Sequence, residues 1–237
     1  MRKRPIENSL FDIPDNQPTP ESVDSWYRSK GYRLIAGVDE AGRGALAGPV
    51  SAAAVILDEK GIAGLADSKK LTPETREELF DQIWKMAQGV GVAMVSQEII
   101  DSTNILRAAM EAMKLAVMSL PVNPEIALID GNRTPVIGID SVAIVKGDTK
   151  SQAIMAASIV AKVTRDRFMD YSARQYPRWG FDRHKGYATK SHIEALTKHG
   201  LSIIHRKTFS PCNEFDEKLH DNREGVTIRG CAKGGLG

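Results

Sequence analysis

The feature that most constrains the fold of this chain is an alternation of short apolar runs with long amphipathic segments. The apolar runs have the length of β-strands and lie at 34–39, 50–57, 91–96, 126–129 and 142–145. The segments between and after them predict helices at 73–87, 98–120, 151–176 and 190–199. Because strands that alternate with helices form sheets covered by helices, we expect an α/β domain with a mixed five-stranded sheet that opens with a β-hairpin.

Two of these helices carry boundary signals. Thr72 precedes Pro73 and Glu74, which is the pattern of a hydroxyl cap, a proline in the first turn and an acid near the positive end of the helix dipole. The segment at 190–199 ends before Gly200, a residue typical of helix C-termini.

The two ends of the chain lack this patterning. Residues 1–28 are polar, contain four prolines and few apolar anchors, and predict a flexible N-terminal arm. Residues 212–237 end in Gly-Gly-Leu-Gly without periodicity and predict a disordered tail. We therefore expect one folded domain over 29–211.

Targeting patterns and cysteines favour a cytoplasmic protein. The basic start Arg2-Lys3-Arg4 is not followed by the apolar run of roughly 7–15 residues that export requires. The chain also has no uncharged apolar stretch of about 18 residues, so we expect no membrane span. Cys212 and Cys231 match no zinc or redox spacing, which predicts free thiols in a reducing compartment. We expect a monomer.

Three of the apolar runs lead into acids. The first ends in Asp39-Glu40, the run at 126–129 is followed by Asp130, and the run at 142–145 is followed three residues later by Asp148. Ligands of α/β sheets collect at the carboxyl ends of strands, where neighbouring carboxylates repel unless a hard divalent cation lies between them. Four acids suffice for two Mg²⁺ or Mn²⁺ ions about 3.5–4 Å apart, which can activate water and stabilise the leaving oxygen of a phosphodiester.

A structural alternative exists for each acid alone, because aspartate favours turns at strand ends. Successive strand residues also face opposite sides, so Asp39 and Glu40 converge only if the strand ends or bends at Glu40. Gly42 and Gly44 would allow such a bend. Three acidic strand ends in one chain favour a metal site.

The segment 172–208 is strongly basic. It contains two acids against eight basic residues, namely Arg174, Arg178, Arg183, Lys185, Lys190, Lys198, Arg206 and Lys207. Aromatic residues lie among them, at Tyr176, Trp179, Phe181 and Tyr187. Basic groups near aromatic rings suit a nucleic-acid backbone with exposed sugars or bases. A solvated face with a few core aromatics explains the pattern equally well.

A glycine-rich turn at 41–49 follows the first pair of acids and contains Gly42-Arg43-Gly44. Glycines permit positive φ and close approach of the main chain to a ligand, while Arg43 adds a charged fork. A tight hairpin connection is the alternative. No Gly-Lys-Ser/Thr follows, so the turn is not a Walker loop.

Six blocks of the sequence stand out together over about residues 33–211. They are Gly37-Val38-Asp39-Glu40-Ala41-Gly42-Arg43-Gly44; Asp67-Ser68-Lys69-Lys70-Leu71; Asp130-Gly131-Asn132; Lys146-Gly147-Asp148-Thr149-Lys150-Ser151; Ala156-Ala157-Ser158-Ile159-Val160-Ala161-Lys162-Val163-Thr164-Arg165-Asp166-Arg167; and Gly180-Phe181-Asp182-Arg183-His184-Lys185-Gly186-Tyr187. In these blocks and in their order, the chain resembles the ribonuclease HII family.

The resemblance implies a ribonuclease H-like fold with a small C-terminal helical extension, about 172–211. It implies a metal-dependent endonuclease that cuts the RNA strand of RNA–DNA hybrids and cuts on the 5′ side of ribonucleotides embedded in duplex DNA, leaving a 3′-hydroxyl and a 5′-phosphate. Carried over to this chain, the catalytic, metal-binding acids are Asp39, Glu40, Asp130 and Asp148. The family's nucleic-acid contacts correspond to Gly42, Arg43 and Gly44 at the ribose 2′-hydroxyl, Lys69 near a backbone phosphate and Tyr187 on the sugar beside the cut.

One position departs from the family pattern: Ala45 stands where the family usually has proline, and losing that restraint on φ could loosen the turn. Asp166 is a possible fifth acid, but it follows Arg165 in the middle of a helix, and we expect it to form a surface ion pair.

Two other functions stay open at this point. A transposase, resolvase or DNA-only endonuclease would share the fold and the metals, and the Gly-Arg-Gly turn and the Tyr187 segment argue against it. A non-catalytic nucleic-acid-binding module would share the basic segment, and the presence of all four acids argues against it.

Overall fold

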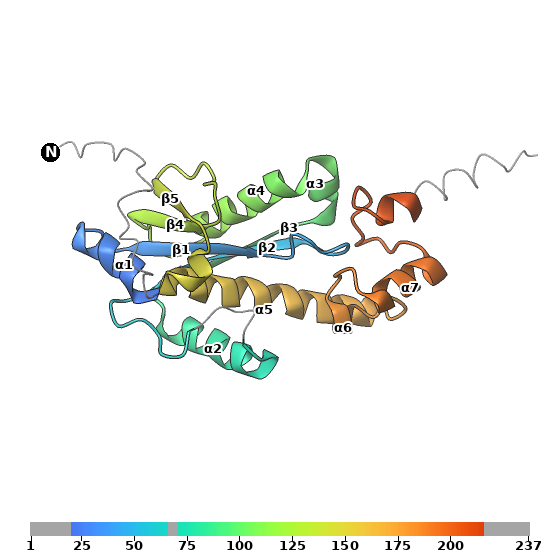
Figure 1. Ribbon diagram of the computed structural model, residues 1–237, viewed down its shortest axis with the longest axis horizontal. Helices are drawn as coiled ribbons and strands as arrows, with labels where there is room; N and C mark the ends of the chain where they lie inside the picture. Colours follow the sequence, from blue (N-terminus) through green and yellow to red (C-terminus); the bar gives the residue numbers. More distant parts are fainter. Residues whose placement is uncertain (1–19, 66–70, 216–237) are drawn as a thin grey trace, which may run out of the picture.

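The computed structural model describes residues 20–65 and 71–215 and has a five-stranded sheet between two layers of helices (Figure 1). The strands are β1 (Ile35–Ala41), β2 (Val50–Ile56), β3 (Gly89–Val95), β4 (Ile126–Asp130) and β5 (Asp140–Ile144). Their order across the sheet is β3-β2-β1-β4-β5. β1, β2 and β3 are antiparallel neighbours, whereas β4 and β5 run parallel to β1. The predicted mixed sheet with an opening hairpin is therefore confirmed.

Helices cover both faces of the sheet. Figure 1 shows α3 (Gln97–Ser102) and α4 (Ile105–Met118) on one side, and α2 (Pro73–Met86) and α5 (Gln152–Gln175) on the other. Alternate residues of β2 serve the two layers, because side chains of a strand point to opposite faces. Ala52 and Ala54 pack in the core under α4, whereas Ala53 and Val55 pack in the core under α2 and α5.

Helix α5 lies unusually close to the central strand. A Cβ atom at Gly37 in β1 would lie 2.0 Å from the carbonyl carbon of Ala153, so only glycine allows this approach. The helix then runs beyond the sheet toward α6 (Phe181–His184) and α7 (Lys190–His199), which form the predicted C-terminal extension (Figure 1). No helix in the described residues is both long and apolar enough to span a membrane.

The single helix predicted at 98–120 is two helices. Thr103 and Asn104 interrupt it, and the side chain of Asn104 accepts a hydrogen bond from the backbone N–H of Arg107 at 2.9 Å. An asparagine cap starts a new helix because its oxygen replaces a missing carbonyl. The signals at Thr72 and Gly200 are confirmed as the N-cap of α2 and the C-cap of α7.

Part of the predicted N-terminal arm is folded. Residues Pro20–Ser29 form α1, in which Val23 and Tyr27 are buried against Ile35. Asp24 accepts hydrogen bonds from Ser151 Oγ at 2.6 Å and from the backbone N–H of Ala153 at 3.2 Å. The prediction for residues 20–28 is therefore wrong, because this helix caps the start of α5. The rest of the arm lies outside the described residues.

The predicted tail also begins too early. Cys212, its first residue, is fully buried with Leu46 and Leu196, and the chain is helical from there to Phe215. Cys212 is a free cysteine, as expected. Cys231 and residues 216–237 lie outside the described residues.

Candidate active site

The predicted acids lie at the carboxyl ends of three adjacent parallel strands. β1 and β4 pair through Val38 and Ile129, so Asp39 and Asp130 are the next residues along two neighbouring strands. Asp148 lies in the 3-10 turn η1 (Gly147–Thr149), which follows β5. The sheet topology thus brings three distant chain segments to one edge.

Asp39 and Glu40 both lie inside β1, which does not end at Glu40. The strand continues to Ala41, because Glu40 remains paired with Ala52 on β2. Asp39 Oδ1 accepts a hydrogen bond from the backbone N–H of Glu40 at 2.7 Å, and Glu40 Oε1 forms an ion pair with Arg43 Nη1 at 3.0 Å. Asp39 is only 7% exposed and the Glu40 side chain only 10%.

Asp130 is held by the turn that carries Asp148. Its Oδ1 accepts a hydrogen bond from the backbone N–H of Gly147 at 2.7 Å. A Cβ atom on Gly147 would lie 2.5 Å from Ile154 Cδ1 and 3.3 Å from Asp130 Oδ1, so glycine lets this turn close on β4. Asp148 follows directly and is buried at 7% exposure.

Burial and mutual repulsion raise the pKa values of the first two acids. The pKa of Asp39 lies well above its usual 3.8, first because burial disfavours the charged form and then because Glu40, Asp130 and Asp148 repel that charge. Burial also raises the pKa of Glu40, although the Arg43 guanidinium opposes this. The other three acids are therefore close enough to Asp39 for their charges to act on it.

The four carboxylates suit a hard divalent cation in chemistry and charge. Within residues 20–65 and 71–215, no three histidine, cysteine or acidic side chains lie together in an arrangement that could hold a metal ion as they stand. Instead, Asp39, Glu40 and Asp130 accept hydrogen bonds from nearby N–H or guanidinium groups. A cation at this edge would relieve the repulsion that raises the pKa of Asp39.

Two buried arginines close the Gly-Arg-Gly turn beside these acids. Arg165 from α5 and Arg206 from the C-terminal extension are both fully buried, and each donates three hydrogen bonds to backbone carbonyls. The acceptors, at 2.7–3.0 Å, are Ala47, Pro49 and Lys185 for Arg165, and Gly42, Arg43 and Gly48 for Arg206. The turn is thus fixed from within the protein.

The two glycines of the turn have different structural roles. Gly42 has a φ of +92°, and a Cβ atom there would lie 1.9 Å from Arg165 Nε. Gly44 has no such φ, and a Cβ atom there would meet nothing within 4 Å. The fold therefore requires glycine at 42 but leaves open space at 44.

Tyr187 lies next to this turn. It is partly exposed, and the cations of Lys162 and Arg165 lie 5.5 Å and 5.3 Å from its ring centroid. The backbone N–H of Leu46 donates to Gly186 O at 2.8 Å, which joins the turn to the Tyr187 segment. Tyr187 is not a core aromatic, so the structural alternative of a fully buried ring is excluded.

Three further sequence features have clear positions. Asp166 forms an ion pair with Lys162 at 2.7 Å, as expected. Ala45 is fully buried, and its N–H donates to Gly42 O at 3.4 Å, so the turn closes without proline. Lys69 lies outside the described residues.

The basic segment is partly buried, contrary to a wholly exposed face. Six of its eight basic residues are exposed, but Lys185 is partly covered and Arg206 is fully buried. Trp179 and Phe181 stack with ring centroids 6.4 Å apart in the core of the extension. For these two rings the structural alternative holds.

A buried histidine chain in this extension had no recognised sequence signal. His192 Nε2 lies 3.0 Å from His205 Nε2, and His192 Nδ1 lies 2.9 Å from Tyr187 O. Burial lowers the pKa of His192 to about 4 and that of His205 to about 3. These rings are neutral core groups that support the backbone of Tyr187.

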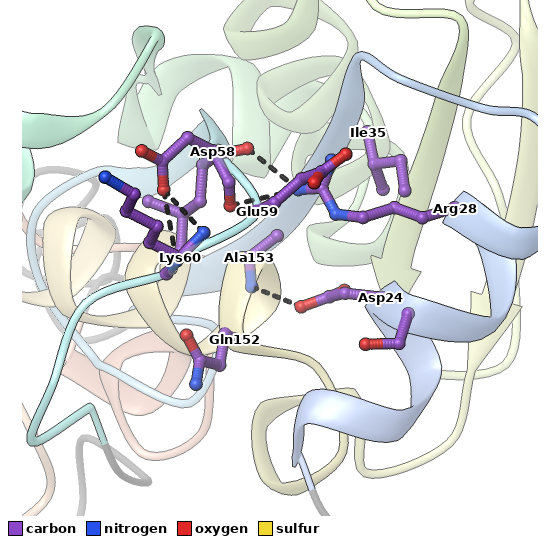
Figure 2. Close-up of a pocket in the computed structure, with 11 residues that line it drawn as sticks. Asp24, Arg28, Ile35, Asp58, Glu59, Lys60, Gln152 and Ala153 are labelled. Carbon is purple, nitrogen blue, oxygen red and sulfur yellow. Dashed lines mark hydrogen bonds between the residues drawn. The ribbon is translucent and has the colours of Figure 1, made fainter.

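A polar recess of about 270 Å³ lies at the opposite end of β1, beside α1 (Figure 2). Two of its charged groups already have partners: Arg28 donates to the carbonyls of Leu57 and Asp58, and Asp24 accepts from Ala153. The recess lies where α1 meets the rest of the domain, and it is separate from the acids at the carboxyl end of β1.

Comparison with known proteins identifies the family. The model of the family described as Ribonuclease HII matches residues 36–212. A ribonuclease HII of Shewanella halifaxensis is 56% identical over 180 residues, covering 76% of this chain and 89% of the relative. One of Caldicellulosiruptor bescii is 52% identical over 182 residues, covering 76% and 88%. The crystal structure of ribonuclease H2 from Pyrococcus horikoshii aligns with a TM-score of 0.67 at 30% identity, covering 79% of this chain and 99% of that one.

Proposed function

The chain belongs to the ribonuclease HII family, and from that premise we propose how its residues perform the reaction. It is a ribonuclease H, a hydrolase that acts on the RNA strand of RNA–DNA hybrids. Within that activity, we assign the chemistry to the acidic edge of the sheet and ribose recognition to the Gly-Arg-Gly turn. The observation that carries this assignment is the repelling, buried set of carboxylates directly beside a turn with open space at Gly44.

The carboxylates of Asp39, Glu40, Asp130 and Asp148 would hold two divalent cations, Mg²⁺ or Mn²⁺. Such ions would supply an activated water and stabilise the leaving oxygen. Asp39 and Asp130 lie on neighbouring strands and would contribute ligands from the sheet, and Asp148 would contribute one from the η1 turn. Glu40 would exchange its ion pair with Arg43 for a ligand role.

The Gly-Arg-Gly turn would read the ribose 2′-hydroxyl. The backbone N–H groups of Arg43 and Gly44 have no hydrogen-bond acceptor among residues 20–65 and 71–215. Gly44 also presents no Cβ to the open space in front of it. A 2′-hydroxyl is both donor and acceptor, so a pair of exposed amides close to the acids in the chain could donate hydrogen bonds to it.

Tyr187 would stack on the sugar beside the cut, supported by the two cations near its ring. Lys69 would contact a backbone phosphate of the substrate. We place the catalytic domain at 29–211 with α1 as an added support, and we retain a cytoplasmic monomer as part of the proposal.

The test is metal-dependent cleavage of a DNA duplex that contains one ribonucleotide. We expect one cut on the 5′ side of that ribonucleotide, with 3′-hydroxyl and 5′-phosphate ends, in Mg²⁺ or Mn²⁺. A matched all-DNA duplex is the control and should stay intact. Equal cutting of both duplexes would instead support a DNA-only endonuclease. Undiminished cleavage in excess chelator would overturn the role of the four acids as metal ligands.

A further inference from the structure

The two buried arginines, Arg165 and Arg206, are charged groups in the interior of the protein. Neither Arg165 nor Arg206 makes an ion pair with an acid in the described part of the chain. Burying a guanidinium is costly, and each of the two meets three carbonyl oxygens that offset this cost. The cost is visible in Arg206, whose pKa falls to about 9 because of burial and repulsion from Arg165. Because hydrophobic residues of similar volume often replace buried charged groups without loss of stability, stability alone does not account for these two arginines.

What they fix is the direction of each peptide unit in the turn. Arg206 Nη2 donates to Gly42 O at 2.7 Å, and its Nη1 donates to Arg43 O at 2.9 Å. In a trans peptide the carbonyl of one residue and the N–H of the next point in opposite directions. With both carbonyls turned toward Arg206, the N–H groups of Arg43 and Gly44 must point away from it. These are the two amides of the turn that have no acceptor in the described part of the chain.

Arg165 connects this turn to the second recognition element. Its guanidinium donates to Ala47 O and to Lys185 O, both at 2.9 Å, and its Cζ lies 5.3 Å from the ring centroid of Tyr187. The same group packs against the α-carbon of Gly42, where a Cβ would collide with it. One side chain therefore spans the turn and the Tyr187 segment.

We propose that Arg165 and Arg206 are positioning residues that orient the Arg43 and Gly44 amides toward the ribose and hold Tyr187 in register with them. Neither guanidinium touches the substrate. The proposal rests on the function proposed above, because it assumes that the turn reads the ribose. The proposal gives the two interior arginines a role in substrate recognition that does not depend on direct contact with the substrate.

The test uses Arg206→Lys and Arg165→Lys, made separately. Lysine keeps the positive charge but loses the planar fork that reaches three carbonyls at once. Two quantities are measured for each variant: binding to a one-ribonucleotide duplex and to the matched all-DNA duplex in chelator, and the single-turnover cleavage rate in Mg²⁺. Arg167→Lys is the matched control, because Arg167 lies on the same helix, is exposed and pairs with Glu77 across the surface. Ile100→Ala, in the core beside α4, controls for a general loss of stability.

We expect both lysine variants to bind all-DNA duplex as the wild type does but to lose the preference for the ribonucleotide. The cleavage rate should fall about 100-fold, the size of effect expected from an ångström-scale misplacement. Arg167→Lys should keep the wild-type preference and rate. Ile100→Ala should lower the melting temperature without changing the preference.

Three results would overturn the proposal. Lysine variants that keep the wild-type preference and rate would show that Arg165 and Arg206 do not set the direction of the two amides. Equal loss of binding to both duplexes, or loss of the folded state in both variants, would assign the arginines a general structural role. A wild-type protein that fails to prefer the ribonucleotide duplex would count against the proposed function itself. That result differs from a failure of the positioning role, in which the wild type shows the preference and the lysine variants keep it.

Discussion

Replacing each glycine of the Gly-Arg-Gly turn by alanine separates the needs of the fold from those of the substrate. Gly44→Ala places a methyl group in open space at a residue whose φ is not in the left-handed region, so we expect no clash and no backbone strain in the folded state. Its free energy of unfolding should stay within about 1 kcal/mol of wild type, with any change toward higher stability because alanine restricts the unfolded chain. Cleavage of a one-ribonucleotide duplex should nevertheless fall about 100-fold, because the methyl group stands where the sugar must approach.

Gly42→Ala should behave in the opposite way. Alanine at a φ of +92° costs about 1–2 kcal/mol. The new Cβ would also lie 1.9 Å from Arg165 Nε and must displace it, which costs roughly 1.5–3 kcal/mol for each charged hydrogen bond lost. The sum of about 3–5 kcal/mol should lower the melting temperature by roughly 10 °C in a domain of this size.

The assay pairs thermal unfolding with single-turnover cleavage for both variants and the wild type. Gly44→Ala with wild-type rate would refute the reasoning, because the sugar would then not approach the turn at that residue. Gly44→Ala with a large melting drop would refute it differently, by showing that position 44 is constrained by packing after all.

Three other outcomes are expected. Asp39→Asn should abolish turnover at a melting temperature equal to or above wild type, because the raised pKa of Asp39 means that its ionised form destabilises the folded state; a variant that keeps more than about a tenth of the wild-type rate, a barrier change under 1.4 kcal/mol, would remove this acid from the metal site. Tyr187→Ala should slow cleavage far more than it weakens binding, and should cost only about 1–2 kcal/mol of stability, since the partly exposed ring loses two cation–π contacts rather than a core site; a large melting drop with equal rate losses on single-ribonucleotide and long-hybrid duplexes would contradict this. Stability should fall as the pH drops below about 6.5 toward 4, because the unfolded chain takes up protons that the buried His192 and His205, with pKa values lowered to about 4 and about 3, refuse. Urea unfolding from pH 8 to 4 measures the free energy of unfolding against pH. The slope should be shallower in His205→Gln, which separates the effect of the histidines from that of the acids, because the raised pKa values of the acids act in the opposite direction. Identical slopes in the variant and the wild type would exclude the histidines as the cause.

The secondary structure was largely predictable because its causes are local. The strand runs before Asp39 and Asp130 are apolar over their whole length, and both lie buried in the sheet. The cap at Thr72 depends only on its own side chain and the first turn after it. Acids at strand ends could be grouped because parallel neighbours share an edge. Local pattern thus predicted which acids lie together at this edge of the sheet.

Features that depend on distant contacts were predicted poorly. Helix α1 has too few apolar residues to be recognised alone, and its contacts are distant in sequence: Val23 and Tyr27 pack against Ile35, and Asp24 accepts a hydrogen bond from Ser151, 127 residues away. The break at Asn104 replaces one long helix by two, although the apolar spacing continues across it. In both cases a hydrogen bond of a polar side chain contributes to the structure, and the spacing of apolar residues does not predict such a bond.

The two buried arginines differ in whether their burial could be predicted from the sequence. Arg165 had a readable signal, since it falls on the spacing of four that joins the buried residues Ala157, Ala161 and Met169, the register of a core face. Arg206 had none, because it lies in a basic segment and its acceptor, Gly42 O, is 164 residues away. The carbonyls of an irregular turn need donors once the turn is buried, and that need arises only when the chain has folded. A charge in the register of a buried helix face therefore indicates a turn elsewhere that it must satisfy, and here that turn is the one expected to read the ribose.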